Sequence, residues 1–101
     1  MFGKLGDMMG KLQEMKQAAE ETKLKLAATR INIEGAGGDI KLVITGDRKI
    51  MDLQIAPGLQ HGSKEELEEQ LTVTLNRAIA AADKVNEEEM KKAAGGLLPG
   101  L

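Results

Sequence analysis

The architecture of this 101-residue chain is set by residues 29–55, TRINIEGAGGDIKLVITGDRKIMDLQI. Isoleucines alternate with polar residues in Thr29–Glu34, which is the pattern of a strand with one buried face. Asp39–Thr45 and Ile50–Ile55 show similar alternation and predict two further strands. The two intervening turns are short and contain glycine. Because short connections favour pairing of successive strands, the sequence predicts a three-stranded antiparallel meander.

Both faces of this sheet are expected to carry some apolar side chains. The main apolar positions are Ile31, Ile33, Ile40, Leu42, Ile44, Met51, Leu53 and Ile55. Val43 and Ile50 point to the opposite face. Two helices cover only one face of a sheet well, and three strands leave two edges open to pairing. We therefore expect a homodimer, with either the sheet or a helix as its interface.

Two long helical patterns flank the strands. The first runs from about Leu5 to Ala28 and repeats apolar or small residues at the three- and four-residue spacing of a heptad seam. The members of this seam are Leu5, Met8, Leu12, Met15, Ala19, Thr22 and Leu26. Such a stripe indicates a core or homodimer contact, with a groove for a partner protein as the alternative.

The second helix is expected to begin after Ser63, which forms a capping box with Glu66. Its apolar stripe is Leu67, Leu71, Leu75, Ala78, Ala82 and Val85, and it continues toward Ala94. The glycines at 95 and 96 are expected to end it. The fold class predicted is therefore α+β: one α-β-β-β-α domain over residues 1–94, followed by a flexible tail over 95–101.

The composition argues against an enzyme. The chain contains no Cys, Trp or Tyr, and His61 is its only histidine, so no disulfide, thiolate metal site or histidine pair is available. No cofactor or metal is expected. The acidic group Glu65, Glu66, Glu68 and Glu69 could suggest acid–base chemistry, but its place at the start of a helix is explained by the helix dipole. No apolar run approaches the ~20 residues of a membrane span, and a cysteine-free chain fits the cytoplasm.

The formal net charge is −2, but the charge is unevenly distributed. Residues 1–30 contain six basic and four acidic residues, a net of +2, whereas residues 31–101 contain eight basic and twelve acidic residues. The first-helix lysines could contact phosphates. Glutamates interspersed among them are equally consistent with a solvated helix face, so the residues alone leave both interpretations open.

Several short motifs occur in a characteristic order. They are Met1-Phe-Gly3, the amphipathic first helix, Gly35-Ala-Gly-Gly38 before an apolar strand, Ile55-Ala-Pro-Gly-Leu59, Glu65-Glu-Leu-Glu-Glu69, Leu75-Asn-Arg-Ala78 and Gly95-Gly-Leu-Leu-Pro-Gly100. This ordered set resembles the YbaB/EbfC family of bacterial nucleoid-associated proteins over essentially the full length.

The resemblance implies a cytoplasmic, nucleoid-located homodimer whose strands build the dimer core and whose helices project from it. It further implies binding of duplex DNA through the first and last helices, with a role in transcription regulation, and no small-molecule substrate or membrane. Carried over by position, the DNA-binding candidates are Lys11, Lys16, Lys23, Lys25, Asn76, Arg77, Lys84, Lys91 and Lys92. The alternative function is a protein-interaction adaptor that uses the Leu/Met seam of the first helix.

Overall fold

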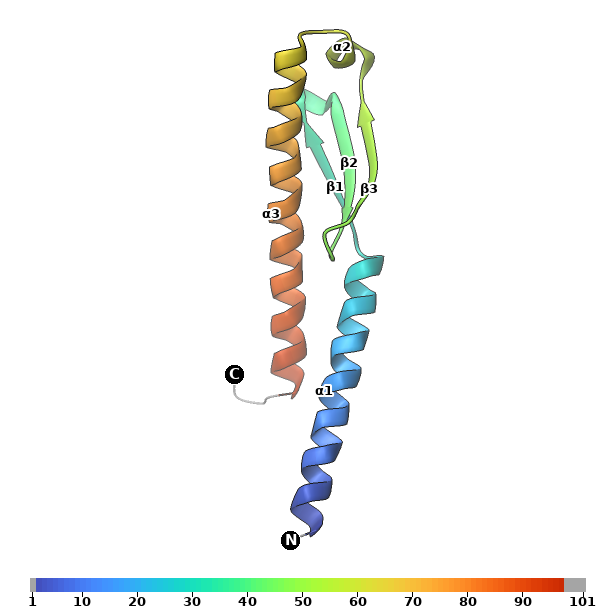
Figure 1. Ribbon diagram of the computed structural model, residues 1–101, viewed down its shortest axis with the longest axis vertical. Coiled ribbons are helices and arrows are strands. Elements are labelled where there is room, and N and C mark those ends of the chain that lie inside the picture. Colours follow the sequence, from blue (N-terminus) through green and yellow to red (C-terminus); the bar gives the residue numbers. More distant parts are fainter. Residues whose placement is uncertain (1, 98–101) are drawn as a thin grey trace.

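The computed structural model describes residues 2–97, with side chains for residues 4–95. A long helix leads into three strands, which are followed by a short helix and a second long helix (Figure 1). The elements are α1 (Phe2–Ala28), β1 (Arg30–Gly35), the 3-10 turn η1 (Ala36–Gly38), β2 (Ile40–Thr45), β3 (Ile50–Ile55), α2 (Pro57–Gln60) and α3 (Lys64–Leu97). The α+β class predicted from the sequence is confirmed.

The three strands form an antiparallel sheet in the order β1-β2-β3, as the meander prediction requires. Leu42 in the central strand pairs with Ile33 on one side and Leu53 on the other. Gly37 and Gly38 have φ angles of +66° and +99° in the first turn, a region that glycine enters without strain. These pairings place most of the main apolar side chains on one face, with Ile50 rather than Met51 opposite Ile44.

The core lies between that face and α3. Leu42, Ile44, Ala78 and Ala82 are buried together, and Ile31, Ile33 and Leu75 pack against them. Small residues on both elements let α3 approach the sheet closely. On the sheet side, an added Cβ at Gly35 of β1 would overlap the Thr74 hydroxyl and lie 2.9 Å from the Thr74 Cβ.

Helix α1 does not cover the sheet. It lies beside the C-terminal half of α3, beyond the end of the strands (Figure 1). Thr22 and Leu26 are buried at this junction, and Leu26 also packs against Gly46 in the β2–β3 turn. The sheet face is therefore covered mainly by α3, so even less of the sheet is covered than two helices could cover.

Strand β3 is left largely uncovered in the protomer. Met51 is 55% exposed and Leu53 is 43% exposed, although Leu53 shares its sheet face with the buried Leu42. The reason is geometric, because the contacts of α3 with the sheet are to β1 and β2. Leu53 and Ile55 are thus on the core face as predicted but are not fully buried. Ile50, which was expected on the opposite face, instead pairs with Ile44, because an irregularity in the register leaves Met51 unpaired.

The helix ends differ in part from the prediction. Ser63 caps α3, since its hydroxyl oxygen accepts the backbone N–H of Glu66 at 3.3 Å. The same hydroxyl donates to the Glu65 carboxylate at 3.1 Å. The reciprocal bond of a capping box, from the Ser63 backbone N–H to the Glu66 carboxylate, is not formed among the described residues. Helix α3 continues to Leu97, past the glycines expected to end it near Ala94, and α2 was not predicted. Residues 98–101 of the predicted tail lie outside the part described.

Candidate nucleic-acid interface

The four candidate lysines of α1 are exposed and fall on two flanks of the helix. Lys16 and Lys23 are seven residues apart, so they share one flank about two turns from each other. Lys11 and Lys25, fourteen residues apart, share the flank on the other side of the apolar seam. The helix therefore presents positive charge on both sides of its apolar stripe.

Three basic residues of α3 form a straight row. Arg77, Lys84 and Lys91 follow one another at seven-residue intervals, which places them on one flank of the helix at a spacing of about 10 Å. All three are exposed. The opposite flank carries Asp83, whose carboxylate binds the guanidinium of Arg48 in the β2–β3 turn. We call Arg77, Lys84 and Lys91 the basic row.

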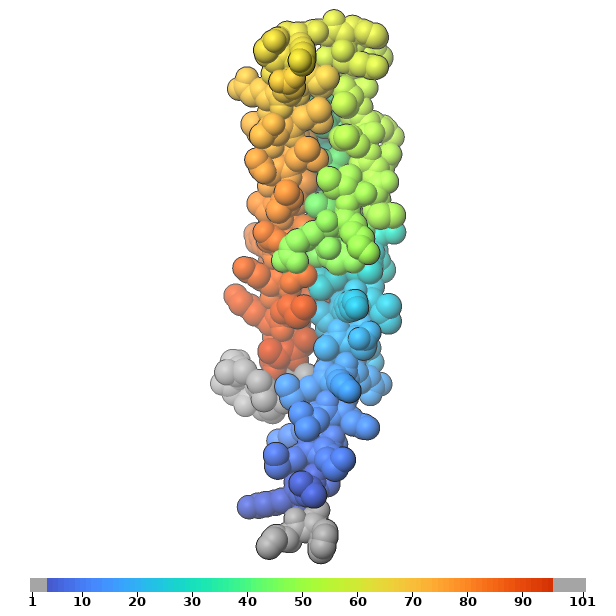
Figure 2. Space-filling view, in the orientation of Figure 1, coloured from blue at the N-terminus to red at the C-terminus, as the bar shows by residue number. Residues whose placement is uncertain are grey.

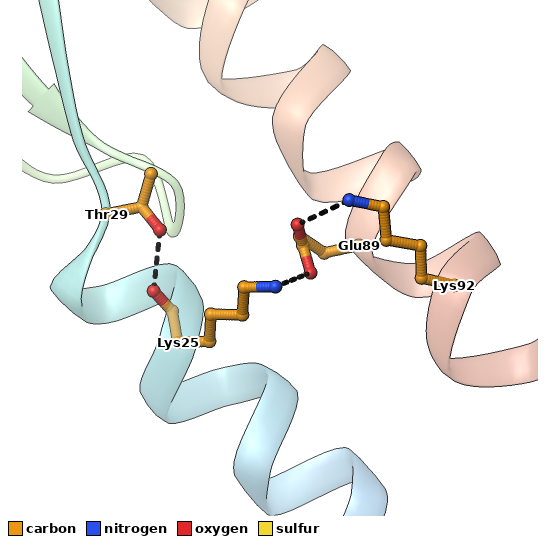
Figure 3. Close-up of polar contacts among 4 residues, drawn as sticks. All are labelled: Lys25, Thr29, Glu89 and Lys92. Atoms are coloured by element: carbon orange, nitrogen blue, oxygen red, sulfur yellow. Dashed lines mark hydrogen bonds and ion pairs between the residues drawn. The ribbon is translucent and has the colours of Figure 1, made fainter. Parts of the chain in front are cut away.

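The remaining candidates on α3 have other surroundings. Asn76 is exposed but lies seven residues before Asp83, so it is on the other flank of α3 from the basic row. Lys92 belongs to a cluster of charges at the junction of α1 and α3, shown in Figure 3. There the Glu89 carboxylate lies 2.9 Å from the Lys25 Nζ and 3.5 Å from the Lys92 Nζ.

Glu89 is the centre of this junction. Its side chain is only 15% exposed, and the hydrogen bond from Lys25, followed by the charges of both lysines, holds the pKa of its carboxyl below the usual value. The hydroxyl of Thr29 donates to the Lys25 carbonyl oxygen at 2.7 Å and tightens the end of α1 (Figure 3). Two of the predicted DNA contacts, Lys25 and Lys92, are thus already paired with a carboxylate.

The structure divides the predicted residues into two groups. Lys25 and Lys92 are paired, whereas the other basic candidates make no ion pair with any residue between 4 and 95. These are Lys11, Lys16, Lys23, Arg77, Lys84 and Lys91. The heptad spacing of the basic row was visible in the sequence and could have singled it out. Glu89 could not have been assigned to Lys25, because 64 positions separate them.

The described residues offer little for other chemistry. Glu65, Glu66, Glu68 and Glu69 are all exposed at the start of α3, where Lys64 lies 3.7 Å from Glu68. Within the described residues, no three or more acidic or histidine side chains gather as metal ligands would. In the same part of the chain, no helix has the length and apolar character needed to cross a membrane.

The chain is similar to curated proteins from several bacteria. A nucleoid-associated protein of Flavobacterium johnsoniae is 39% identical over 93% of this chain and 88% of its own length. A nucleoid-associated protein of Akkermansia muciniphila is 38% identical over 89% of this chain and 88% of its own. Among solved structures, an uncharacterized protein from Helicobacter pylori superposes with a TM-score of 0.66 at 28% identity, covering 86% of this chain and 98% of that one.

These likenesses extend along nearly the whole chain and include the order of its helices and strands. The sequence model of one DNA-binding family matches residues 1–97, which is almost the entire length. The chain therefore belongs to the YbaB/EbfC DNA-binding family.

Proposed function

We propose that this protein binds duplex DNA as a homodimer and serves as a nucleoid-associated protein of the cytoplasm with a role in gene regulation. The observation that carries the proposal is the set of basic side chains on α1 and α3 that have no carboxylate partner among the described residues. The family is a DNA-binding one, and its curated relatives are named nucleoid-associated proteins. Neither description is that of an enzyme.

The proposed mechanism is electrostatic. Lysine and arginine side chains that neutralise backbone phosphates release condensed counterions, and this release drives binding without reading sequence. The basic row on α3 and the pair Lys16 and Lys23 on α1 are each spaced by two helical turns, about 10 Å. Such rows are suited to contacting phosphates at intervals along the DNA backbone rather than to reading base edges.

The dimer is proposed to form through β3. This strand is an open edge of the sheet, and its exposed side chains include Met51 and Leu53. An open apolar edge strand invites pairing with another chain. A second copy placed there would cover the part of the apolar face that α3 leaves bare, and it would present two sets of projecting helices to one duplex.

The decisive experiment measures fluorescence anisotropy of a labelled duplex titrated with protein at several salt concentrations. Binding should weaken as salt rises, with a slope of about −0.9 in log K against log salt for each phosphate neutralised. The double charge reversal Lys16→Glu and Lys23→Glu removes four contacts per dimer. The slope should therefore become shallower by about 3.6, and affinity should fall steeply.

A matched control is the double variant Lys49→Glu with Lys64→Glu. It changes the net charge equally, at exposed positions outside both the basic row and the first helix. The control should keep the salt slope of the original protein. An equal loss of DNA affinity in both double variants would show that net charge, rather than the position of these lysines, determines binding. No binding at low salt would remove the proposed function.

A further inference from the structure

The N-terminal part of α1 has an apolar stripe without a partner in the protomer. Leu5, Met8, Leu12 and Met15 are 61%, 63%, 61% and 46% exposed. Figure 2 shows this part of the helix, in blue, extending beyond the C-terminal part of α3. These four residues are the first part of the heptad seam, and we refer to them as the Leu/Met seam.

The charges beside this stripe are all of one sign. With the seam at heptad positions a and d, every charged residue at the flanking positions e and g is a lysine: Lys4, Lys11, Lys16, Lys23 and Lys25. The acidic residues of the helix, Asp7, Glu14, Glu20 and Glu21, all lie at outward positions. The charge pattern therefore distinguishes the seam from the rest of the helix surface.

The same seam already packs against a helix at its other end. Thr22 and Leu26 continue the stripe and are buried where α1 lies along α3. At that contact a flanking lysine, Lys25, pairs with Glu89 of the facing helix at 2.9 Å. At its buried end, the seam thus packs against a helix whose contact surface is small or apolar and has a carboxylate beside it.

Two other occupants fit the seam less well. A second copy of α1 would face lysine with lysine at the flanking positions in either orientation, and like charges there oppose pairing. A lipid surface favours helices with a broad apolar sector and a basic polar face. Here residues 4–21 carry three lysines against four acidic residues, so the polar face is not basic, although Met9 widens the apolar stripe on one side.

We propose that the Leu/Met seam docks an acidic amphipathic helix of a partner protein, with apolar residues at heptad spacing and Asp or Glu beside them. This interaction surface is separate from the basic row on α3, but it is bordered by Lys11 and Lys16, which are also DNA-binding candidates. The exposed seam, from Leu5 to Met15, spans 11 residues, or ~16 Å. An interface this short belongs to the weak, transient class, so the affinity should be micromolar.

The test uses a fluorescent synthetic peptide of three heptads with Leu at a and d and Glu at e and g. Anisotropy with the full chain should show saturable binding that weakens with salt. Leu12→Ser should lower the affinity about ten-fold or more, because it removes the central apolar contact. Leu24→Ser is the matched control, since Leu24 is 68% exposed on the same helix but lies off the seam. It should bind as the original protein does.

Further measurements separate the possible failures. Circular dichroism of the Leu12→Ser variant should match the original, and its affinity for duplex DNA should be kept, so a loss of peptide binding cannot come from unfolding or from the proposed DNA function. The proposal is overturned if a peptide with Lys at e and g binds equally well, or if Leu12→Ser leaves binding of the acidic peptide unchanged. It is also overturned if this substitution instead abolishes self-association or cosedimentation with phosphatidylglycerol vesicles.

Discussion

Leu53 offers a quantitative test of the proposed dimer. It is 43% exposed in the protomer, yet its strand pairing places it on the same face as the buried Leu42. Complete burial of a leucine side chain is worth ~1.5–3 kcal/mol, so roughly half of that, about 1 kcal/mol, remains to be gained in an interface. A two-fold dimer contains the residue twice. Leu53→Ala should therefore weaken dimerisation by about 2 kcal/mol, which is about thirty-fold in the dimer dissociation constant.

Sedimentation equilibrium over a dilution series measures this constant directly. Leu24→Ala is the control, because it truncates the same residue type at an exposed position on α1, away from the sheet. Ile44→Ala provides the contrast: this side chain is 1% exposed within one protomer, so its loss should cost about 2–5 kcal/mol in the free energy of unfolding. An unchanged dimer constant for Leu53→Ala, or a chain that is monomeric throughout, would refute the placement of the interface on β3.

Three further substitutions test individual contacts. Ser63→Ala should lower the free energy of unfolding by about 1 kcal/mol in chemical denaturation because the cap of α3 is lost; an unchanged value would show that the cap contributes nothing. Gly35→Ala should cost about 1–3 kcal/mol through overlap with Thr74, and adding Thr74→Ala should recover part of the loss in a double-mutant cycle; simple additivity would contradict the close contact. The lowered pKa of Glu89 means that its ion pairs contribute stability above its ordinary pKa of 4.5 and lose it as the pH falls through the lowered value. Between neutral and acidic pH, the free energy of unfolding measured by urea titration should therefore fall less in the Glu89→Gln variant than in the original protein. The same pH dependence in both proteins would exclude this role.

The fold could be predicted from the sequence wherever a local period or cap determined it. Alternation in residues 29–55 identified the strands to within a residue or so, and Ser63 marked the start of α3. The position of each helix relative to the other elements was harder to predict. The heptad seam of α1 gave no sign that only its last part, around Thr22 and Leu26, would be buried, because burial depends on where α3 passes.

The end of α3 shows another limit of local reasoning. The glycines at 95 and 96 predicted a stop near Ala94, yet the helix continues to Leu97. Glycine lowers helix propensity by about 1 kcal/mol but does not block the backbone hydrogen bonds, so it does not end a helix by itself. Helix ends are therefore less certain than helix starts that carry a capping side chain.

For the candidate interface, the sequence identified the charged residues but not which of them are engaged. Lys25 and Glu89 are far apart in the chain, and only the crossing of α1 and α3 brings them together. By contrast, the seven-residue spacing of Arg77, Lys84 and Lys91 is a property of the sequence alone. Spacing along one helix can be derived from residue numbers, whereas pairing between helices needs the tertiary structure.

Within the described residues, helix α1 is held by buried contacts only near its C-terminal end, and its N-terminal part projects from this junction. Its buried contacts are at Thr22 and Leu26, and Lys25 ties the same turn to Glu89. From Thr22 to Lys4 the helix runs about 27 Å, so a rotation of about 10° at this pivot displaces the tip by ~5 Å. A small change of angle at this one junction is thereby amplified into a displacement of several ångströms at the far end of the helix. The core cluster of Leu42, Ile44, Ala78 and Ala82 includes neither of the α1 residues at this junction.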